Sequence, residues 1–128
     1  MPITFRLDTA TGVPFYRQVI DQILAGIATG ALRAGEQLPT VRALAVDLKV
    51  NLNTVGKAYK ELEIRGVLTT QQGSGTFIAA VAVERDEVER RRLVVQLADE
   101  FLARAAAAGL PPEEVLAELT ARFGERKP

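Results

Sequence analysis

Two short amphipathic patterns separated by a very tight turn constrain this chain more than any other feature. Thr40 is a residue type that caps helix N-termini, and apolar residues follow it at helical spacing, namely Val41, Leu44, Ala45 and Leu48. Asn51 is a second capping signal only a few residues later. The helix after it is predicted to bury Val55, Ala58, Tyr59 and Leu62 and to turn Asn53, Gly56, Lys57, Lys60 and Ile64 the other way. Two helices joined by a turn around Val50 predict a helix-turn-helix.

A further helix is predicted before this pair. Pro14 suits a first helical turn and Gly30 suits a C-terminal cap. Between them lies an apolar stripe at steps of three and four residues: Phe15, Val19, Ile20, Ile23, Leu24 and Ile27. The segment that follows is too short and too interrupted for a helix, and it is interpreted as a loop with a short strand ending at Leu38.

A β-hairpin is predicted after the third helix. Residues 67–72 and 76–78 are rich in β-branched and polar side chains, and Gly73-Ser74-Gly75 between them is interpreted as a three-residue connection. A helix-turn-helix followed by a hairpin is a winged helix. We therefore expect a mainly α fold with a small β-hairpin, and a winged helix-turn-helix domain over residues 1–80.

The remaining residues, 81–128, predict a helical tail. Residues 84–108 lack glycine and proline and are dense in strong helix formers, and a second helix opens at Pro111 and stops at Gly124. One helix pair cannot cover all of its own apolar surface, so a partner chain is the expected cover. The predicted dimerisation residues are Val94, Leu97, Ala98, Phe101, Leu116, Leu119 and Phe123.

Composition excludes several classes of function. The chain has no cysteine, histidine or tryptophan, so disulfides, thiolate nucleophiles, Cys/His metal sites and imidazole-based catalysis are absent. We expect no enzyme activity and no cofactor. Apolar runs fall short of the roughly 20 residues that span a bilayer, so no membrane association and a cytoplasmic location are expected.

The net charge of zero conceals an asymmetry between the two parts of the chain. Residues 1–80 hold eight basic and six acidic residues, and residues 81–128 hold eight basic and ten acidic ones. A positive front and a negative tail fit a chain that binds a polyanion at one end.

At this point the sequence resembles the GntR-type bacterial repressors. Four blocks carry the resemblance in order and without a gap: PFYRQV at 14–19, GALRAGEQLPTVRALA at 30–45, VNLNTVGKAYKELE at 50–63 and GSGTFI at 73–78. The asparagines, the Ala58-Tyr59 pair and the short tail look most like the YtrA subfamily. In that subfamily two dimerisation helices replace a larger effector domain, so the resemblance implies a homodimer and names no small-molecule effector.

The resemblance implies DNA contacts by Arg42, Thr54 and the wing-tip residue Gly73. The sequence departs from the family at Leu52 and Gly56, where many members carry arginine. Recognition of guanine by arginine is therefore not expected at these two positions. Lys57 is the nearest remaining cation, and Asn53 could bind adenine through two hydrogen bonds. The full predicted DNA-binding set is Thr40, Arg42, Asn51, Asn53, Thr54, Lys57, Lys60, Gln72, Gly73, Ser74 and Gly75.

These observations predict a sequence-specific transcriptional regulator, a repressor that binds double-stranded DNA at a palindromic operator as a homodimer. The alternative is a winged helix used only as a protein–protein interaction module. An apolar patch on the third helix would favour that alternative, whereas a polar and cationic face favours DNA.

Overall fold

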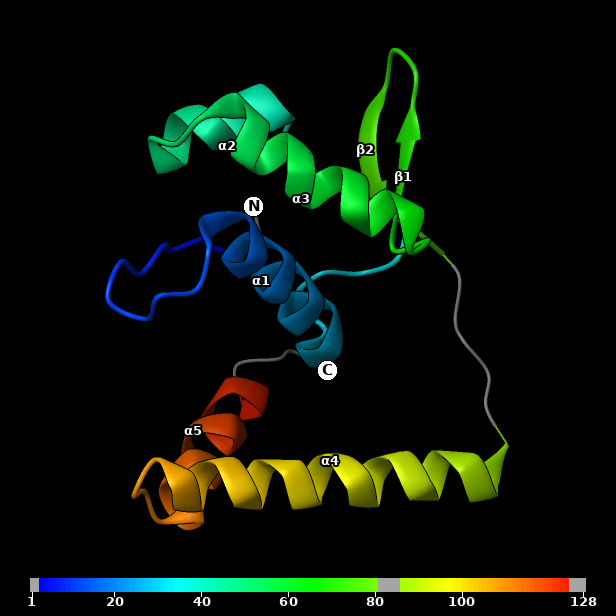
Figure 1. The fold of residues 1–128 in the computed structure, drawn as a ribbon. Coiled ribbons are helices and arrows are strands. Elements are labelled where there is room, and N and C mark those ends of the chain that lie inside the picture. Colours follow the sequence, from blue (N-terminus) through cyan, green and yellow to red (C-terminus); the bar gives the residue numbers. More distant parts are fainter. Residues whose placement is uncertain (1–2, 81–85, 125–128) are drawn as a thin grey trace. The chain divides into compact units, whose positions relative to one another are not determined.

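The computed structural model describes residues 3–80 and 86–124. The chain divides into two compact units, residues 1–81 and 82–128, and each is described by itself. Within the described residues the order of elements is α1, α2, α3, β1, β2, α4 and α5 (Figure 1). The expected combination of a mainly helical fold and one antiparallel hairpin is confirmed.

Three helices build the first unit: α1 (Phe15–Thr29), α2 (Val41–Leu48) and α3 (Leu52–Ile64). Thr40 caps α2 through its side chain, which accepts from the Ala43 N–H, and Asn51 caps α3 by accepting from the Asn53 N–H. The turn between α2 and α3 depends on Lys49, which has a φ of 57°. That left-handed conformation is one that glycine adopts more easily.

The hairpin pairs β1 (Leu68–Gln71) with β2 (Gly75–Ile78) in antiparallel register, from Leu68 opposite Ile78 to Gln71 opposite Gly75. The predicted connection is therefore wrong by one residue, because Gly75 belongs to β2 and the loop is residues 72–74. The strand expected to end at Leu38 is reduced to one bridge between Gln37 and Phe77. Since this segment also donates from the Leu38 N–H to the Thr76 carbonyl, it still ties the hairpin to the start of α2.

One hydrophobic core holds the first unit together. It takes its largest fully buried side chains from α1, α3 and the loop after α1: Ile20, Ile23, Leu32, Leu62, Val19 and Val55. Tyr59 is also buried, and its hydroxyl donates a 2.7 Å hydrogen bond to the Pro39 carbonyl. That bond joins α3 to the residue before the α2 cap, so it helps to fix where α2 begins.

The segment before α1 is irregular, as expected, but α1 holds it in place. The Gln18 side chain accepts from the Asp8 N–H at 2.8 Å and donates to the Asp8 carbonyl at 2.9 Å. One helical turn later Gln22 makes the same reciprocal pair with the backbone of Arg6. Gln18 and Gln22, at i and i+4, thus match two alternate backbone positions of an extended chain, and Phe5, just before the first of these positions, is buried.

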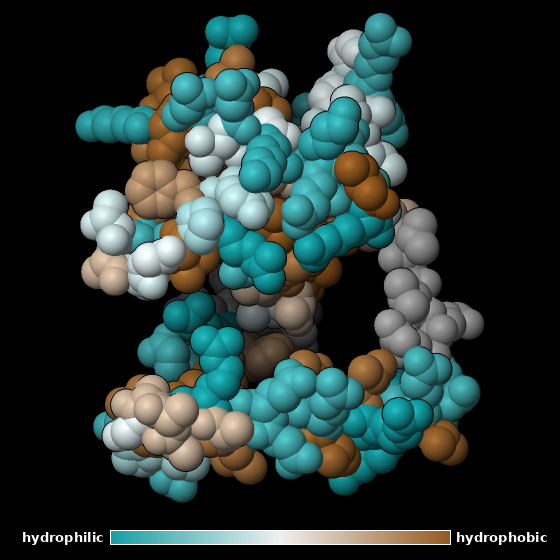
Figure 2. All heavy atoms as spheres, viewed as in Figure 1, coloured by the Kyte–Doolittle hydropathy of each residue, from teal (hydrophilic) through white to brown (hydrophobic). Residues whose placement is uncertain are grey.

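The second unit consists of α4 (Glu87–Ala107) and α5 (Pro112–Gly124). Asp86 caps α4 by accepting from the Glu89 N–H. Residues 84 and 85, where the predicted helical pattern began, lie outside the described part. Ala105 is the one buried residue of these two helices in the described range. Figure 2 shows brown apolar side chains interrupting the hydrophilic surface of this unit.

Candidate nucleic-acid interface

The start of α2 presents a hydroxyl and a cation to solvent. The Thr40 side-chain oxygen accepts from the Ala43 N–H at 3.0 Å, which leaves its O–H free to donate outward. Arg42 is exposed on the first turn, and no carboxylate of the described chain pairs with it. A donor hydroxyl beside an unpaired guanidinium suits a phosphate group.

The exposed face of α3 carries amides and cations. Asn51 and Asn53 are both exposed; the Asn51 oxygen accepts from the Asn53 N–H at 2.7 Å, which uses one of its two lone pairs, and within the described chain the Asn51 NH₂ group is wholly free for a partner. Asn53 keeps both its donor and its acceptor, which is what recognition of adenine requires. Thr54 is half-buried and Lys60 is exposed.

Lys57 is exposed, and its ammonium lies 4.0 Å from the centre of the Tyr16 ring on α1. This is a cation–π contact between α1 and the exposed face of α3. The sequence prediction placed Lys57 correctly on that face but missed Tyr16, because the contact joins residues of two different helices. The contact holds the ammonium toward the α1 side of the face.

The wing brings a second group of predicted residues to the end of the hairpin. Gln72, Gly73 and Ser74 are exposed, and Gly73 has a φ of 82° that suits glycine. Figure 1 shows the hairpin projecting from the C-terminal end of α3.

Gly75 has a structural role that the sequence did not indicate. A Cβ at this position would lie 2.5 Å from Gln37 Nε2, and the same Gln37 amide donates to the Ser74 carbonyl at 2.9 Å. Gly75 therefore makes room for a side chain that braces the wing from the segment before α2.

The second unit presents the predicted dimerisation residues largely at its surface. Val94, Leu97, Leu116, Leu119 and Phe123 are 40–63% exposed, Ala98 is exposed, and Phe101 is half-buried. Sequence reasoning missed three more exposed apolar residues of α4, at Val88, Val95 and Leu102. Their spacing widens the apolar surface beyond the predicted stripe.

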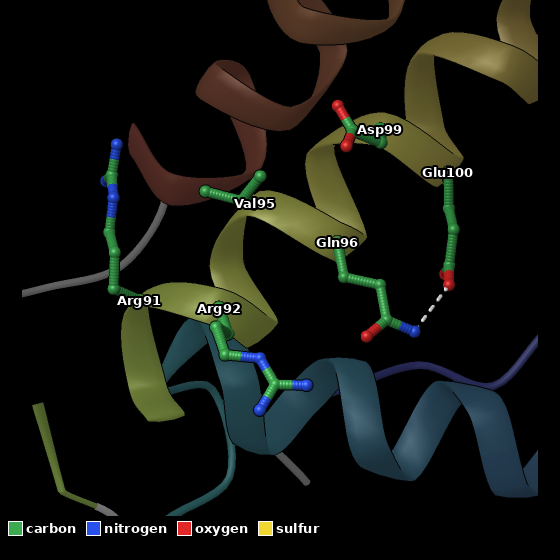
Figure 3. A pocket seen from close by; sticks show the side chains of 6 residues that line it. All are labelled: Arg91, Arg92, Val95, Gln96, Asp99 and Glu100. Carbon is green, nitrogen blue, oxygen red and sulfur yellow. Dashed lines mark hydrogen bonds between the residues drawn. The ribbon is translucent and has the colours of Figure 1, made fainter. Parts of the chain in front are cut away.

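A shallow depression lies on one face of α4, lined by Arg91, Arg92, Val95, Gln96, Asp99 and Glu100 (Figure 3). All of its lining comes from one helix, and Gln96 donates to Glu100 at 3.0 Å across it. Such a surface lacks the enclosure of a small-molecule site. In the described residues, acidic side chains do not gather into a group that could hold a metal ion, and no helix is long and apolar enough to cross a membrane.

The three-helix core, the turn between α2 and α3, and the hairpin define a winged helix-turn-helix protein. Residues 15–78, half of the chain, match the family described as bacterial regulatory proteins, gntR family. The chain belongs to the GntR family. Members of this family are transcriptional regulators rather than enzymes.

Curated relatives match most of the chain. YhcF of Bacillus subtilis, a helix-turn-helix transcriptional regulator, is 38% identical over 103 residues, which is 80% of this chain and 84% of that protein. The transcriptional repressor YtrA of the same organism is 33% identical over 110 residues, covering 86% and 85%. The resemblance to YtrA-like regulators is thereby confirmed.

Solved structures of related regulators are similar in fold. A transcriptional antiterminator from Listeria monocytogenes EGD-e has a TM-score of 0.67 and 29% identity, and the match covers 98% of this chain and 92% of that one. The DNA-binding domain of AraR in complex with operator ORE1 has a TM-score of 0.50 and 31% identity over 60% of this chain and 94% of that one. The second structure shows a related domain bound to its operator.

Proposed function

We propose that this protein is a transcriptional repressor that binds a palindromic operator as a homodimer. The observation that carries the proposal is the exposed face of α3, where Asn53 and Lys60 stand free of intramolecular partners in the described chain. A chain of the GntR family with such a face is suited to direct recognition of base edges. A cytoplasmic location goes with this function, because the DNA of bacteria is there.

The proposed roles follow the three surfaces of the first unit. Helix α3 enters the major groove, the start of α2 with Thr40 and Arg42 holds the DNA backbone, and the wing tip reaches the adjacent groove. Arg42, Lys49, Lys57 and Lys60 neutralise phosphates and release counterions. Residues 1–80 are thus the DNA-binding domain.

Residues 81–128 are proposed as the dimerisation region. The support is the number of large apolar side chains that α4 and α5 leave exposed beside a single buried alanine. A second copy would cover them, and a two-fold axis through that contact would present two α3 helices to two half-sites of a palindrome.

The DNA-binding proposal is tested by selecting an operator from random duplexes and comparing it with a scrambled duplex. Arg42→Ala should weaken both complexes together, because a phosphate contact carries no sequence information. Lys57 neutralises phosphate charge and also reaches a base edge, so Lys57→Ala should weaken the operator complex by about 1–3 kcal/mol more than the scrambled complex. Arg33→Ala, which removes an exposed arginine outside the three surfaces, is the matched control.

Specific outcomes would contradict these roles. An Arg42→Ala protein that binds scrambled DNA normally but loses the operator would make Arg42 a base-contacting residue. Wild-type binding by both variants would show that DNA does not use this face, and would favour the protein-interaction alternative.

Salt dependence gives an independent measure of the phosphate contacts. Four contacts in each subunit make about eight in a dimer, so the slope of log K against log salt should be near −7. A slope near zero would exclude the proposed contacts.

The dimer is tested by sedimentation. A chain truncated after Ala80 retains its own hydrophobic core and should be monomeric. In the full chain Leu97→Asp should weaken the dimer, whereas Val46→Asp, at an exposed apolar position of α2, should not. A truncated chain that stays dimeric would place the interface in the first unit.

A further inference from the structure

Leu52 is a large apolar side chain at the N-terminal end of the exposed face of α3, where its neighbours are polar. It is the first residue of the helix, directly after the Asn51 cap, and it is 43% exposed. Its sequence neighbours on either side, Asn51 and Asn53, are exposed amides. In the proposed complex this position lies at the N-terminal end of the recognition helix, where side chains reach base edges.

The surroundings of Leu52 leave space beside it. One helical turn further along the same ridge stands Gly56, which has no side chain. A Cβ built there would have Val41 Cγ1 as its nearest neighbour, at 3.9 Å. The ridge therefore has an apolar side chain, then a notch, and then the cation of Lys60.

The notch and the cation–π contact lie on opposite flanks of the exposed face. Gly56 borders α2 through Val41, and Lys57 borders α1 through Tyr16. Asn53 and Lys60 lie between these flanks on the helical wheel. Leu52 is thus an apolar contact on the α2 side of a face whose centre is polar.

Thymine is the base that offers an apolar group in the major groove, its C5-methyl, and apolar side chains contact it. We propose that Leu52 contacts a thymine methyl in each operator half-site, with Gly56 leaving room for the base edge. The inference rests on the proposed DNA-binding function and adds the identity of one recognised base. Asn53, the next residue, offers the donor and acceptor that adenine requires, so the contacted step is rich in A·T pairs.

The experiment uses the full chain and an operator selected from random duplexes. Each thymine of a half-site is replaced in turn by deoxyuridine, which removes the methyl group and keeps every hydrogen-bonding group. At one position the replacement should weaken binding about fourfold in one half-site and about fifteenfold in both, the size expected from burying one methyl-sized group. At the other thymines binding should stay unchanged.

Two variants test whether Leu52 is the residue that contacts the thymine methyl group. Leu52→Ala should bind the thymine and deoxyuridine operators equally. Ile64→Ala is the matched control, because Ile64 is also a large exposed apolar residue of α3, 76% exposed, but it is the last residue of the helix. It should keep the full difference between the two operators. Both side chains are exposed, so both variants should fold, which circular dichroism checks.

Each other outcome overturns the inference. An operator whose half-site holds no thymine, or one that is insensitive to every deoxyuridine, refutes it while leaving operator binding intact. A Leu52→Ala protein that still prefers thymine assigns the methyl contact to another residue. If selection yields no preferred duplex at all, the proposed function fails together with the inference.

Discussion

Gly26 and Gly56 are both interior residues of helices, but the structure predicts different effects when each is replaced by alanine. Gly26 is buried in α1, and a Cβ there would lie 2.9 Å from Leu32 Cδ1, 3.1 Å from Leu32 Cγ and 3.4 Å from Ile3 Cγ2. Gly56 in α3 has only Val41 Cγ1 near the corresponding position, at 3.9 Å. The two substitutions are chemically identical, so they separate helix propensity from packing.

The magnitudes follow from these contacts. Alanine is favoured over glycine in a helix interior by about 1 kcal/mol, and this gain applies to both sites. Gly56→Ala should therefore raise the free energy of unfolding by about 1 kcal/mol, or roughly 4–8 °C in melting temperature for a domain of this size. At Gly26 the added methyl overpacks against Leu32, which is 2% exposed and has little room to move. Overpacking costs about 1–3 kcal/mol, so Gly26→Ala should be that much less stable than Gly56→Ala.

Urea unfolding at one protein concentration, followed by circular dichroism, measures both variants against the wild type. Similar m-values would show that only the stability of the folded state has changed. If Gly26→Ala proves as stable as Gly56→Ala, Leu32 does not pack against α1 as described. If Gly56→Ala is destabilised, an atom must crowd the exposed face of α3 that the structure leaves open.

Three further predictions concern single contacts. Burial raises the pKa of the Tyr59 phenol, so the free energy of unfolding should be full below about pH 10 and should fall above it by up to about 1.4 kcal/mol per pH unit. Urea titrations at several pH values should show that Tyr59→Phe removes this fall. Lys49→Gly should be about 1 kcal/mol more stable than Lys49→Ala, because both remove the charge but only glycine relieves the left-handed φ of 57°; equal stabilities would refute the strain. A double-mutant cycle of Tyr16→Leu and Lys57→Met should give a coupling of about 0.5–1 kcal/mol in unfolding free energy, and a coupling of zero would remove the cation–π contact.

Much of the first unit was predictable because its signals are local. The caps at Thr40 and Asn51 mark the starts of two helices, and both side chains make the expected hydrogen bonds. Gly30, with a φ of 83°, ends α1 as a left-handed cap. A residue type that satisfies a helix end acts within three or four positions of itself, so it can be recognised without knowledge of the rest of the fold.

The prediction was wrong where the structural role of a residue depends on a contact with a residue far away in the sequence. Gly75 reads as part of a turn, but it lies in β2 and makes room for Gln37, which is 38 positions earlier in the chain. The strand expected before Pro39 became a single bridge between Gln37 and Phe77. Backbone hydrogen bonds from the Leu38 N–H to Thr76 and from the Ile78 N–H to Glu36 flank that bridge. Hydrogen bonds between a side chain and a distant stretch of backbone, such as those of Gln18 with Asp8, have no periodic signal in the sequence.

The second unit shows what composition predicts and what it leaves open. Strong helix formers define α4 and α5, and helix propensity acts without a partner. Packing, in contrast, needs a partner surface. The two helices bury only Ala105 in the described range, while Val88, Val94, Leu97 and Leu116 are each at least half exposed. Helices in proteins gain most of their stability from packing of an apolar face, so this pair by itself has little packing to stabilise it. The sequence predicted one stripe along α4, but exposed Val88, Val95 and Leu102 extend the apolar surface beyond that stripe. A dimer interface that draws on more than one flank of α4 is the arrangement that would use all of them.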